Sequence, residues 1–212
     1  IQARTDPDAP PPFRLIEPVD DSAWGRAFDA MPEPSPGDVF LDFEGHPFWR
    51  ADTGLFFLMG LIAQDETGSG EWAYQAYWAH DEAGEAQITR ELIEWLAERR
   101  RSYPDMHVYH YNHTERSSLQ ALTTTHGIDQ AELTNLIESG FFVDLYAIVR
   151  NGIQVGAESY SLKEIERLTA FERRDELGKG ANAVIEYEAF MADSDQAHLD
   201  RIAAYNRDDV LA

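Results

Sequence analysis

The chain of 212 residues contains no cysteine. This absence excludes a disulfide framework, a thiolate nucleophile and a cysteine-ligated zinc site. No run of 18 or more apolar residues occurs, so the sequence predicts no membrane-spanning helix. The N-terminus also lacks the basic-then-apolar pattern of a secretory signal. We therefore expect a cytoplasmic protein.

Basic residues are scarce, since 17 Lys and Arg stand against 39 Asp and Glu and give a formal net charge of −22. A protein that binds nucleic acid unaided usually carries a basic surface, and this charge repels a polyanion. The two short basic clusters, residues 99–101 and 173–174, fit solvated helix and loop surface slightly better than a binding surface. If the chain acts on nucleic acid, we expect another domain to supply most of the affinity.

The chain is long enough for one domain with a sizeable core, and 43% of its residues are apolar. We expect residues 1–35 to be a Pro-rich linker followed by a short helix over residues 22–31, and residues 36–212 to form the domain. The chain starts without methionine and stops in a helix-like pattern, so we expect a domain excised from a longer protein.

Hydrophobic periodicity predicts an α/β fold with a mixed sheet, three antiparallel strands followed by parallel ones, flanked by helices. The expected strands are residues 39–44, 55–64, 71–78, 107–111 and 141–144. The expected helices are residues 82–101, a helix from 113, residues 129–139, and most of 145–212 with interruptions near 152–158 and 177–180. Residues 65–70 fit a hairpin turn between the second and third strands.

Two carboxylates lie two positions apart in the apolar run of the first strand. Side chains in a strand alternate between faces, so Asp42 and Glu44 point the same way, about 6.7 Å apart along the backbone. Buried like charges this close raise each other's pKa, and a hard divalent cation such as Mg²⁺ or Mn²⁺ relieves the repulsion. The pattern is short, and a solvated strand end explains it equally well.

The C-terminal segment carries a second group of polar residues on a predicted helix that begins near Asp195. Tyr205 and Asp209 are four residues apart, so both side chains can enter one cleft. Taken alone, the segment fits better a core tyrosine beside a solvated acidic helix end. Asp208 competes with Asp209 for the role of acidic ligand.

Glu115 is the candidate for a further carboxylate because it follows the strand over residues 107–111 at the start of a helix. Two interpretations fit this position. Glu115 either reaches a metal site, or completes a helix capping box with Asn112 three residues earlier.

Five motifs in order resemble those of the DEDDy exonucleases of the ribonuclease-H-like superfamily, and more closely a bacterial group of predicted RecB-family nucleases with ribonuclease-H-like domains. The matching stretches are residues 41–45, 108–112, 143–146, 159–163 and 205–209. Most such nucleases carry Asp where this chain has Glu115. The histidine subclass would need a histidine five residues before Asp209, where this chain has Ala204. Only the tyrosine subclass therefore fits.

The resemblance implies a 3′-5′ exonuclease with two Mg²⁺ or Mn²⁺ ions. Asp42, Glu44 and Asp209 would hold one ion, Asp42 and Glu115 the other, and Tyr205 would orient the attacking water. It also implies nucleic acid with a single-stranded end as substrate, and a helicase or second nuclease domain in the same longer chain.

Further polar residues are candidates for supporting roles. Lys163 lies just inside the start of a predicted helix. There it either contacts a phosphate or is exposed to solvent. Asn112 and His46 are candidates for substrate contact because they flank the acidic motifs. Asp144 either supports the metal site or caps the helix that follows it.

Two other functions remain open. The chain could be a catalytically degenerate domain that serves as a binding module for an attached helicase or nuclease. It could also be a glycosidase, which would use a carboxylate pair but leave Tyr205 and Asp209 without a role.

Overall fold

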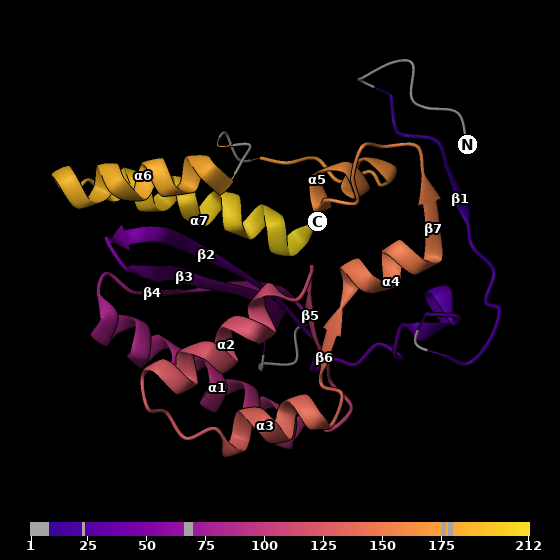
Figure 1. Cartoon of the computed structure of the whole chain (residues 1–212), viewed down its shortest axis with the longest axis horizontal. Helices are drawn as coiled ribbons and strands as arrows, with labels where there is room; N and C mark the ends of the chain where they lie inside the picture. The colour runs from indigo at the N-terminus through magenta and orange to yellow at the C-terminus, as the bar shows by residue number, and fades with distance from the viewer. Residues whose placement is uncertain (1–8, 23, 66–69, 175–176, 178–179) are drawn as a thin grey trace.

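The computed structural model describes residues 9–22, 24–65, 70–174, 177 and 180–212. A five-stranded sheet lies between two layers of helices, with a smaller two-stranded sheet at one side (Figure 1). The strands are β1 (Phe13–Leu15), β2 (Val39–Arg50), β3 (Thr53–Gln64), β4 (Trp72–Trp78), β5 (Val108–His110), β6 (Phe142–Asp144) and β7 (Ile153–Val155). The α-helices are α1 (Glu82–Ser102), α2 (Thr114–Thr125), α3 (Ala131–Glu138), α4 (Leu145–Gly152), α5 (Leu162–Ile165), α6 (Gly180–Asp193) and α7 (Gln196–Leu211).

The large sheet has the strand order β4-β3-β2-β5-β6. β2, β3 and β4 are antiparallel neighbours, while β5 pairs parallel with β2 and β6 pairs parallel with β5. This topology confirms the predicted α/β fold with three antiparallel strands followed by parallel ones. None of the helices in the described ranges is both long and apolar enough to cross a bilayer.

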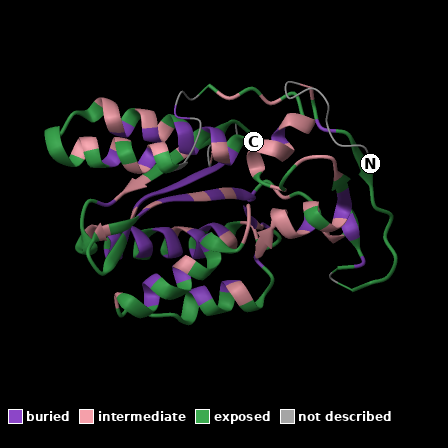
Figure 2. Ribbon diagram, turned by 45° about the horizontal axis from the view of Figure 1, so that its top comes forward, coloured by how far each residue is buried: buried purple, intermediate pink, exposed green. Residues whose placement is uncertain are grey.

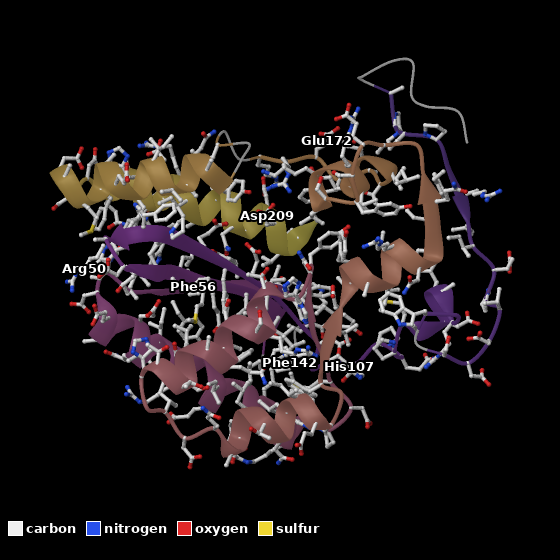
Figure 3. All side chains as sticks on the ribbon, in the orientation of Figure 1. Arg50, Phe56, His107, Phe142, Glu172 and Asp209 are labelled. Carbon is white, nitrogen blue, oxygen red and sulfur yellow. The ribbon has the colours of Figure 1, made fainter. Side chains whose placement is uncertain are left out.

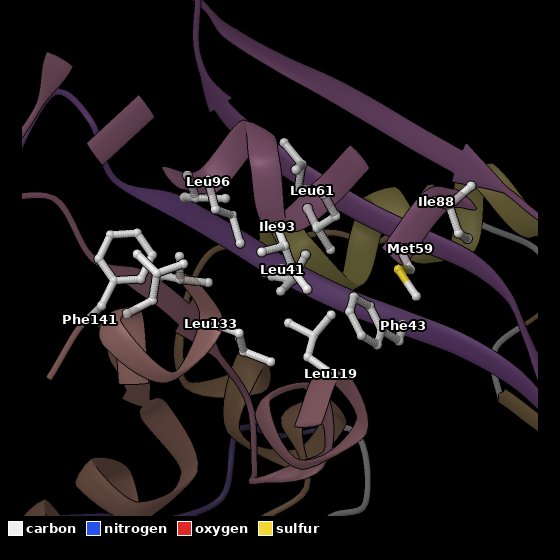
Figure 4. Close-up of a cluster of buried hydrophobic side chains, with 14 of the residues drawn as sticks. Leu41, Phe43, Met59, Leu61, Ile88, Ile93, Leu96, Leu119, Leu133 and Phe141 are labelled. Carbon is white, nitrogen blue, oxygen red and sulfur yellow. The ribbon is translucent and has the colours of Figure 1, made fainter. Parts of the chain in front are cut away.

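The two faces of the large sheet are covered by different helices. Leu41 and Phe43 point from β2 toward α1, α2 and α3 and pack with Leu92 and Leu119 in the main apolar core (Figure 4). α6 and α7 cover the opposite face (Figure 1). The central strands are buried between these layers (Figure 2), so the polar side chains of β2 that face α7 lie inside the molecule.

The N-terminal segment contains a strand that the sequence analysis did not predict. β1 pairs antiparallel with β7, whose three residues fall within the predicted interruption at 152–158. The predicted helix over residues 22–31 is a single 3-10 turn, η1 (Ala27–Ala30). Its Phe28 ring lies so close to Gly152 that a Cβ there would come within 2.6 Å of it. Residues 66–69 of the predicted hairpin turn and residues 178–179 of the predicted interruption lie outside the described residues.

Arg99 is buried, which corrects the interpretation of residues 99–101 as solvated surface. Its guanidinium donates to the carbonyl oxygens of Gly37 at 2.8 Å, Gln64 at 3.0 Å and Pro36 at 3.3 Å. Helical periodicity places Arg99 on the buried face of α1, and the carbonyls at the strand ends replace the water that its charge loses. Its neighbour Arg101 remains on the surface.

We expect Arg99→Met to lower the free energy of unfolding by about 3 kcal/mol or more, because the carbonyls of Gly37, Gln64 and Pro36 lose a charged donor and the Gly37 carbonyl is buried. Arg101→Met is the matched control, since among the described residues the ion pairs of this exposed side chain are with Glu98 and Glu132 on the surface. It should change stability by about 1 kcal/mol or less. Urea unfolding of both variants measures the difference, and equal losses would contradict the structural role of Arg99.

Candidate metal centre

Three carboxylates from distant parts of the sequence meet between the sheet and α7. One oxygen each of Asp42, Glu44 and Asp209 lies within 4.8 Å of the other two. Asp209 is marked on α7, beside the sheet, in Figure 3. Glu44 is buried, and Asp42 and Asp209 are half-buried. A set of hard oxygen donors this compact has the chemistry that Mg²⁺ and Mn²⁺ prefer.

Local sequence explains why these side chains converge. Strand alternation turns Asp42 and Glu44 away from the apolar core and toward α7. Asp195 caps the start of α7 by accepting from the backbone N–H of Ala197, and the helix then crosses this face of the sheet. Positions 202, 206 and 209 recur on one side of α7, so Asp209 points to the strand carboxylates.

Asn206 is a site residue that the sequence analysis missed. Its side chain is fully buried, and its Nδ2 donates to Asp42 Oδ2 at 2.8 Å and to the Asp42 carbonyl at 3.2 Å. The Tyr74 hydroxyl donates to Asn206 Oδ1 at 2.8 Å. The amide therefore orients Asp42 without adding charge. Its position four residues after Ile202 on the buried face was the available sequence signal.

Asn206 fits only because Gly60 faces it. Gly60 pairs with Asp42 in the register of β2 and β3, and a Cβ at Gly60 would lie 1.6 Å from Asn206 Oδ1. Any larger residue at this position would displace the amide. Immediately after Glu44, the register between β2 and β3 shifts at Gly45, a type of irregularity that is frequent beside active sites.

The acidic cluster has strongly perturbed electrostatics. Burial, followed by the charges of Glu44, Asp209 and Glu115, raises the pKa of Asp42 well above its usual range. Burial and Asp209 raise the pKa of Glu44 to about 8. Burial also raises the pKa of Asp209, although Arg173 and Lys163 oppose this. The charged forms of these groups thus need a cation for compensation.

Lys163 and Tyr205 lie together at the edge of this cluster. Lys163 Nζ donates to the Tyr205 hydroxyl at 3.0 Å and lies 4.3 Å from the centre of the Tyr205 ring. Burial, followed by the charge of Asp209, raises the pKa of the Tyr205 hydroxyl. The alternative in which Lys163 is simply solvated is therefore wrong, because the side chain is half-buried against the candidate site.

Arg173 is a second missed residue, and its position corrects the interpretation of residues 173–174 as solvated surface, which holds only for the exposed Arg174. Its Nε and one terminal nitrogen bind Glu166 at 2.8 and 2.6 Å, and the same terminal nitrogen lies 2.6 Å from Asp209 Oδ1. The guanidinium thus links Asp209 to the short 3-10 helix η2 (Glu166–Leu168). Nothing in the local sequence around Arg173 indicates this contact.

Glu115 lies near the cluster but outside the group of three oxygens. It is buried, its charge raises the pKa of Asp42, and His110 Nδ1 lies 3.5 Å from its Oε2. Among the described residues, no group forms a hydrogen bond with that oxygen. The capping-box interpretation is wrong, because His113 and not Asn112 occupies the N-cap position of α2, and the Asn112 N–H donates to Asp144 instead of Glu115.

The remaining predicted residues lie apart from the three carboxylates. Asn112 has a positive φ of 85° and accepts from the His113 N–H. The His46 Nε2 lies 3.0 Å from Glu188 of α6. Asp144 accepts from the Ala147 N–H at the start of α4, which confirms its interpretation as a helix cap. Asp208 accepts from the Arg174 N–H at 2.5 Å and is not part of the group.

Most of the chain matches a known protein-family model. A family model described as RNase_H_2, of the RNase H superfamily, matches residues 39–212. The chain belongs to the RNase H superfamily. No curated protein and no solved structure matched the chain.

The site of this RNase H superfamily member fits a divalent cation. All donors in the acidic group are carboxylate oxygens, and the buried Glu115 oxygen that lacks a hydrogen bond is available nearby. Membership and geometry together are consistent with a nucleic-acid phosphodiesterase, whereas a glycosidase would leave Tyr205 and Asp209 unexplained.

We expect the stability of the metal-free protein to fall as pH rises from about 5 to about 8.5. The folded pKa of Glu44 is about 8, above its ordinary value of 4.5, so the folded state binds more protons in this interval. The contribution of Glu44 to stability is fully present below its ordinary pKa of 4.5 and is lost as pH rises through its folded pKa of about 8. Glu44→Gln should flatten the decline in melting temperature measured in EDTA. Identical slopes for the two proteins would contradict the shifted pKa.

Proposed function

We propose that this chain hydrolyses phosphodiester bonds of nucleic acid in a reaction that depends on divalent cations. The observation that carries the proposal is the convergence of Asp42, Glu44 and Asp209 within 4.8 Å in a site that raises the pKa of all three. Perturbed carboxylates in a concave site are typical of catalytic centres. Membership of the RNase H superfamily independently supports the same function.

The acidic residues would divide between two cation positions. Asp42, Glu44 and Asp209 would hold one Mg²⁺ or Mn²⁺, and Asp42 and Glu115 would hold a second, with Glu115 binding directly or through water. The unbonded Glu115 oxygen and its electrostatic effect on Asp42 support this assignment. When bound, such cations lower the pKa of a coordinated water and offset the negative charge that develops on the phosphate.

Tyr205 would orient the attacking water rather than take its proton. Burial and the charges of Asp209 and Glu44 raise the pKa of its hydroxyl far above the ordinary value, so the group stays protonated near neutral pH. Lys163 fixes the hydroxyl position by donating to its oxygen. The protonated hydroxyl would then be able to donate a hydrogen bond to a water molecule beside the acidic group.

The two cationic side chains would have separate roles. Lys163 would contact a phosphate oxygen of the substrate, since its ammonium lies at the edge of the acidic group. Arg173 would hold Asp209 in position from the side of Glu166, as partners behind a metal ligand commonly do. Asn206 would perform the same task for Asp42.

We further propose that the activity is of the DEDDy 3′-5′ exonuclease type, related to the predicted RecB-family group. The spacing of Tyr205 and Asp209 on α7 supports the tyrosine version, as does the Tyr205 hydroxyl that Lys163 holds beside the acidic group. With a net charge of −22, an attached helicase or second nuclease domain would supply most of the long-range attraction to nucleic acid.

We expect Asp42→Asn to abolish cation-dependent cleavage of labelled single-stranded DNA or RNA in Mn²⁺ and to weaken Mn²⁺ binding in calorimetry by at least about tenfold. The variant should fold, and in EDTA at pH 8 it should melt higher than the wild type, because one buried charge is removed. Asp208→Asn is the matched control, since Asp208 lies outside the acidic group.

Each outcome separates the candidate functions. Cleavage retained by Asp42→Asn would remove this residue from the mechanism. Tight Mn²⁺ binding by the wild type with no cleavage of single- or double-stranded DNA or RNA would favour the catalytically degenerate binding module.

Tyr205→Phe should lower kcat by about tenfold to a hundredfold and leave the Kd for Mn²⁺ nearly unchanged, because only the orienting hydroxyl is lost. The variant keeps the ring that Lys163 contacts. Single-turnover cleavage and calorimetry measure the two quantities separately. Loss of Mn²⁺ binding would show that the hydroxyl maintains the ligand geometry instead.

A further inference from the structure

A relay of hydrogen bonds, from Tyr74 through Asn206 to Asp42, crosses the sheet and ends at the acidic centre. The Tyr74 hydroxyl of β4 donates to Asn206 Oδ1 at 2.8 Å, and Asn206 Nδ2 donates to Asp42 Oδ2 at 2.8 Å. β3 lies between β4 and β2, so Tyr74 and Asp42 belong to strands that are not neighbours (Figure 1). Tyr74 is thus connected to the carboxylates through a single amide.

Gly60 of the intervening strand leaves room for this relay. In the register of the sheet, Gly60 pairs with Asp42 of β2 on one side and with Ala76 of β4 on the other. Tyr74 lies two positions from Ala76 and therefore on the same face of β4. A Cβ at Gly60 would lie 1.6 Å from Asn206 Oδ1 and 3.0 Å from the Tyr74 hydroxyl. The two polar groups thus meet in the space that a side chain on β3 would fill.

The direction of the relay is set by an acceptor that cannot become a donor. Asn206 Nδ2 also donates to the backbone carbonyl oxygen of Asp42 at 3.2 Å, and a carbonyl oxygen only accepts. The amide oxygen is therefore turned away from Asp42 and toward Tyr74, whose hydroxyl supplies the proton. In the opposite orientation, the amide oxygen would face both the carbonyl and the carboxylate of Asp42 and would be repelled by them.

The relay restricts the rotation of the Asp42 carboxylate. The terminal torsion of an aspartate side chain is broad, so the carboxylate turns easily unless a hydrogen bond fixes it. Asn206 supplies that bond at one end, and Tyr74 holds the other end of the amide. Asp42 belongs to both proposed cation positions, so the angle of its carboxylate decides whether the two positions can form together.

We propose that Tyr74 is a positioning residue of the cation centre, which acts on Asp42 through Asn206. The inference rests on the proposed function for its effect on cleavage, whereas its effect on cation binding can be tested without cleavage. Hydrogen bonds in a low-dielectric interior polarise one another, so loss of the Tyr74 hydroxyl weakens the bond from Asn206 to Asp42. Residues that orient a metal ligand commonly change metal affinity or activity by about tenfold to a hundredfold when they are removed. Tyr74 lies one step further from the ligand, so we expect a smaller effect.

A double-mutant cycle, measured by calorimetry with Mn²⁺, tests whether the two residues act in series. Tyr74→Phe should weaken Mn²⁺ binding by about threefold to tenfold, and Asn206→Ala by about tenfold or more. In the double variant, Tyr74→Phe should add almost no further loss, because the hydroxyl acts only through the amide. Additive losses in the double variant would overturn the inference, as would an unchanged Kd for Tyr74→Phe.

Tyr77→Phe is the matched control, because Tyr77 lies on the opposite face of β4 and its hydroxyl donates to Gln75 at 3.3 Å. This variant should bind Mn²⁺ as the wild type does. Melting curves in EDTA measure stability separately, and a Tyr74→Phe variant that melts lower but keeps the wild-type Kd would overturn the inference. If Tyr74→Phe fails to fold, Gly60→Ala serves instead, since its Cβ breaks the same hydrogen bond from the side of β3. An unchanged Kd for Gly60→Ala would also overturn the inference.

Cleavage of labelled single-stranded DNA in Mn²⁺ separates failure of this inference from failure of the proposed function. Tyr74→Phe should lower kcat by about threefold to tenfold and leave KM for the DNA nearly unchanged, because ligand geometry changes and substrate contact does not. Coupled losses of Mn²⁺ affinity, with no cleavage by the wild type, would support the relay and contradict the nuclease activity. Cleavage by the wild type, with neither Kd nor kcat changed in Tyr74→Phe, would support the nuclease and overturn the role of Tyr74.

Discussion

Mutual repulsion among three closely spaced carboxylates is the constraint on which the surroundings of α7 depend. Asp42, Glu44 and Asp209 lie together in a largely buried site, and burial raises the pKa of all three. Neighbouring carboxylate charges raise the pKa of Asp42 and Glu44 further. A fold tolerates this arrangement only if other groups compensate it. The neutral Asn206 donates to Asp42, and Lys163 opposes the pKa shifts of Glu44 and Asp209. A divalent cation would complete the compensation.

The two helical layers contribute differently to this arrangement. α1, α2 and α3 pack against an apolar face of the sheet and build the main core. α6 and α7 cover the other face, where the polar side chains of β2 point. The segment between β7 and α6 then supplies Lys163, Glu166 and Arg173 around the carboxylates. The site is therefore complete only after the last part of the chain has packed on the sheet.

The distribution of charge also shapes how a substrate would be recognised. The chain repels a polyanion at long range, so attraction must come from bound cations, from an attached domain, or from contacts that are not electrostatic.

The sequence by itself determined the fold class and the side of β2 on which Asp42 and Glu44 lie, because hydrophobic periodicity is a local property. It also placed Tyr205 and Asp209 on one side of a helix, and their role as ligands and orienting group stays a prediction. Only the tertiary structure decided that Arg173 pairs with Asp209, that Gly60 makes room for a buried amide, and that β1 pairs with β7. These contacts join residues far apart in the chain. Their partners are set by packing in three dimensions, which no local pattern encodes.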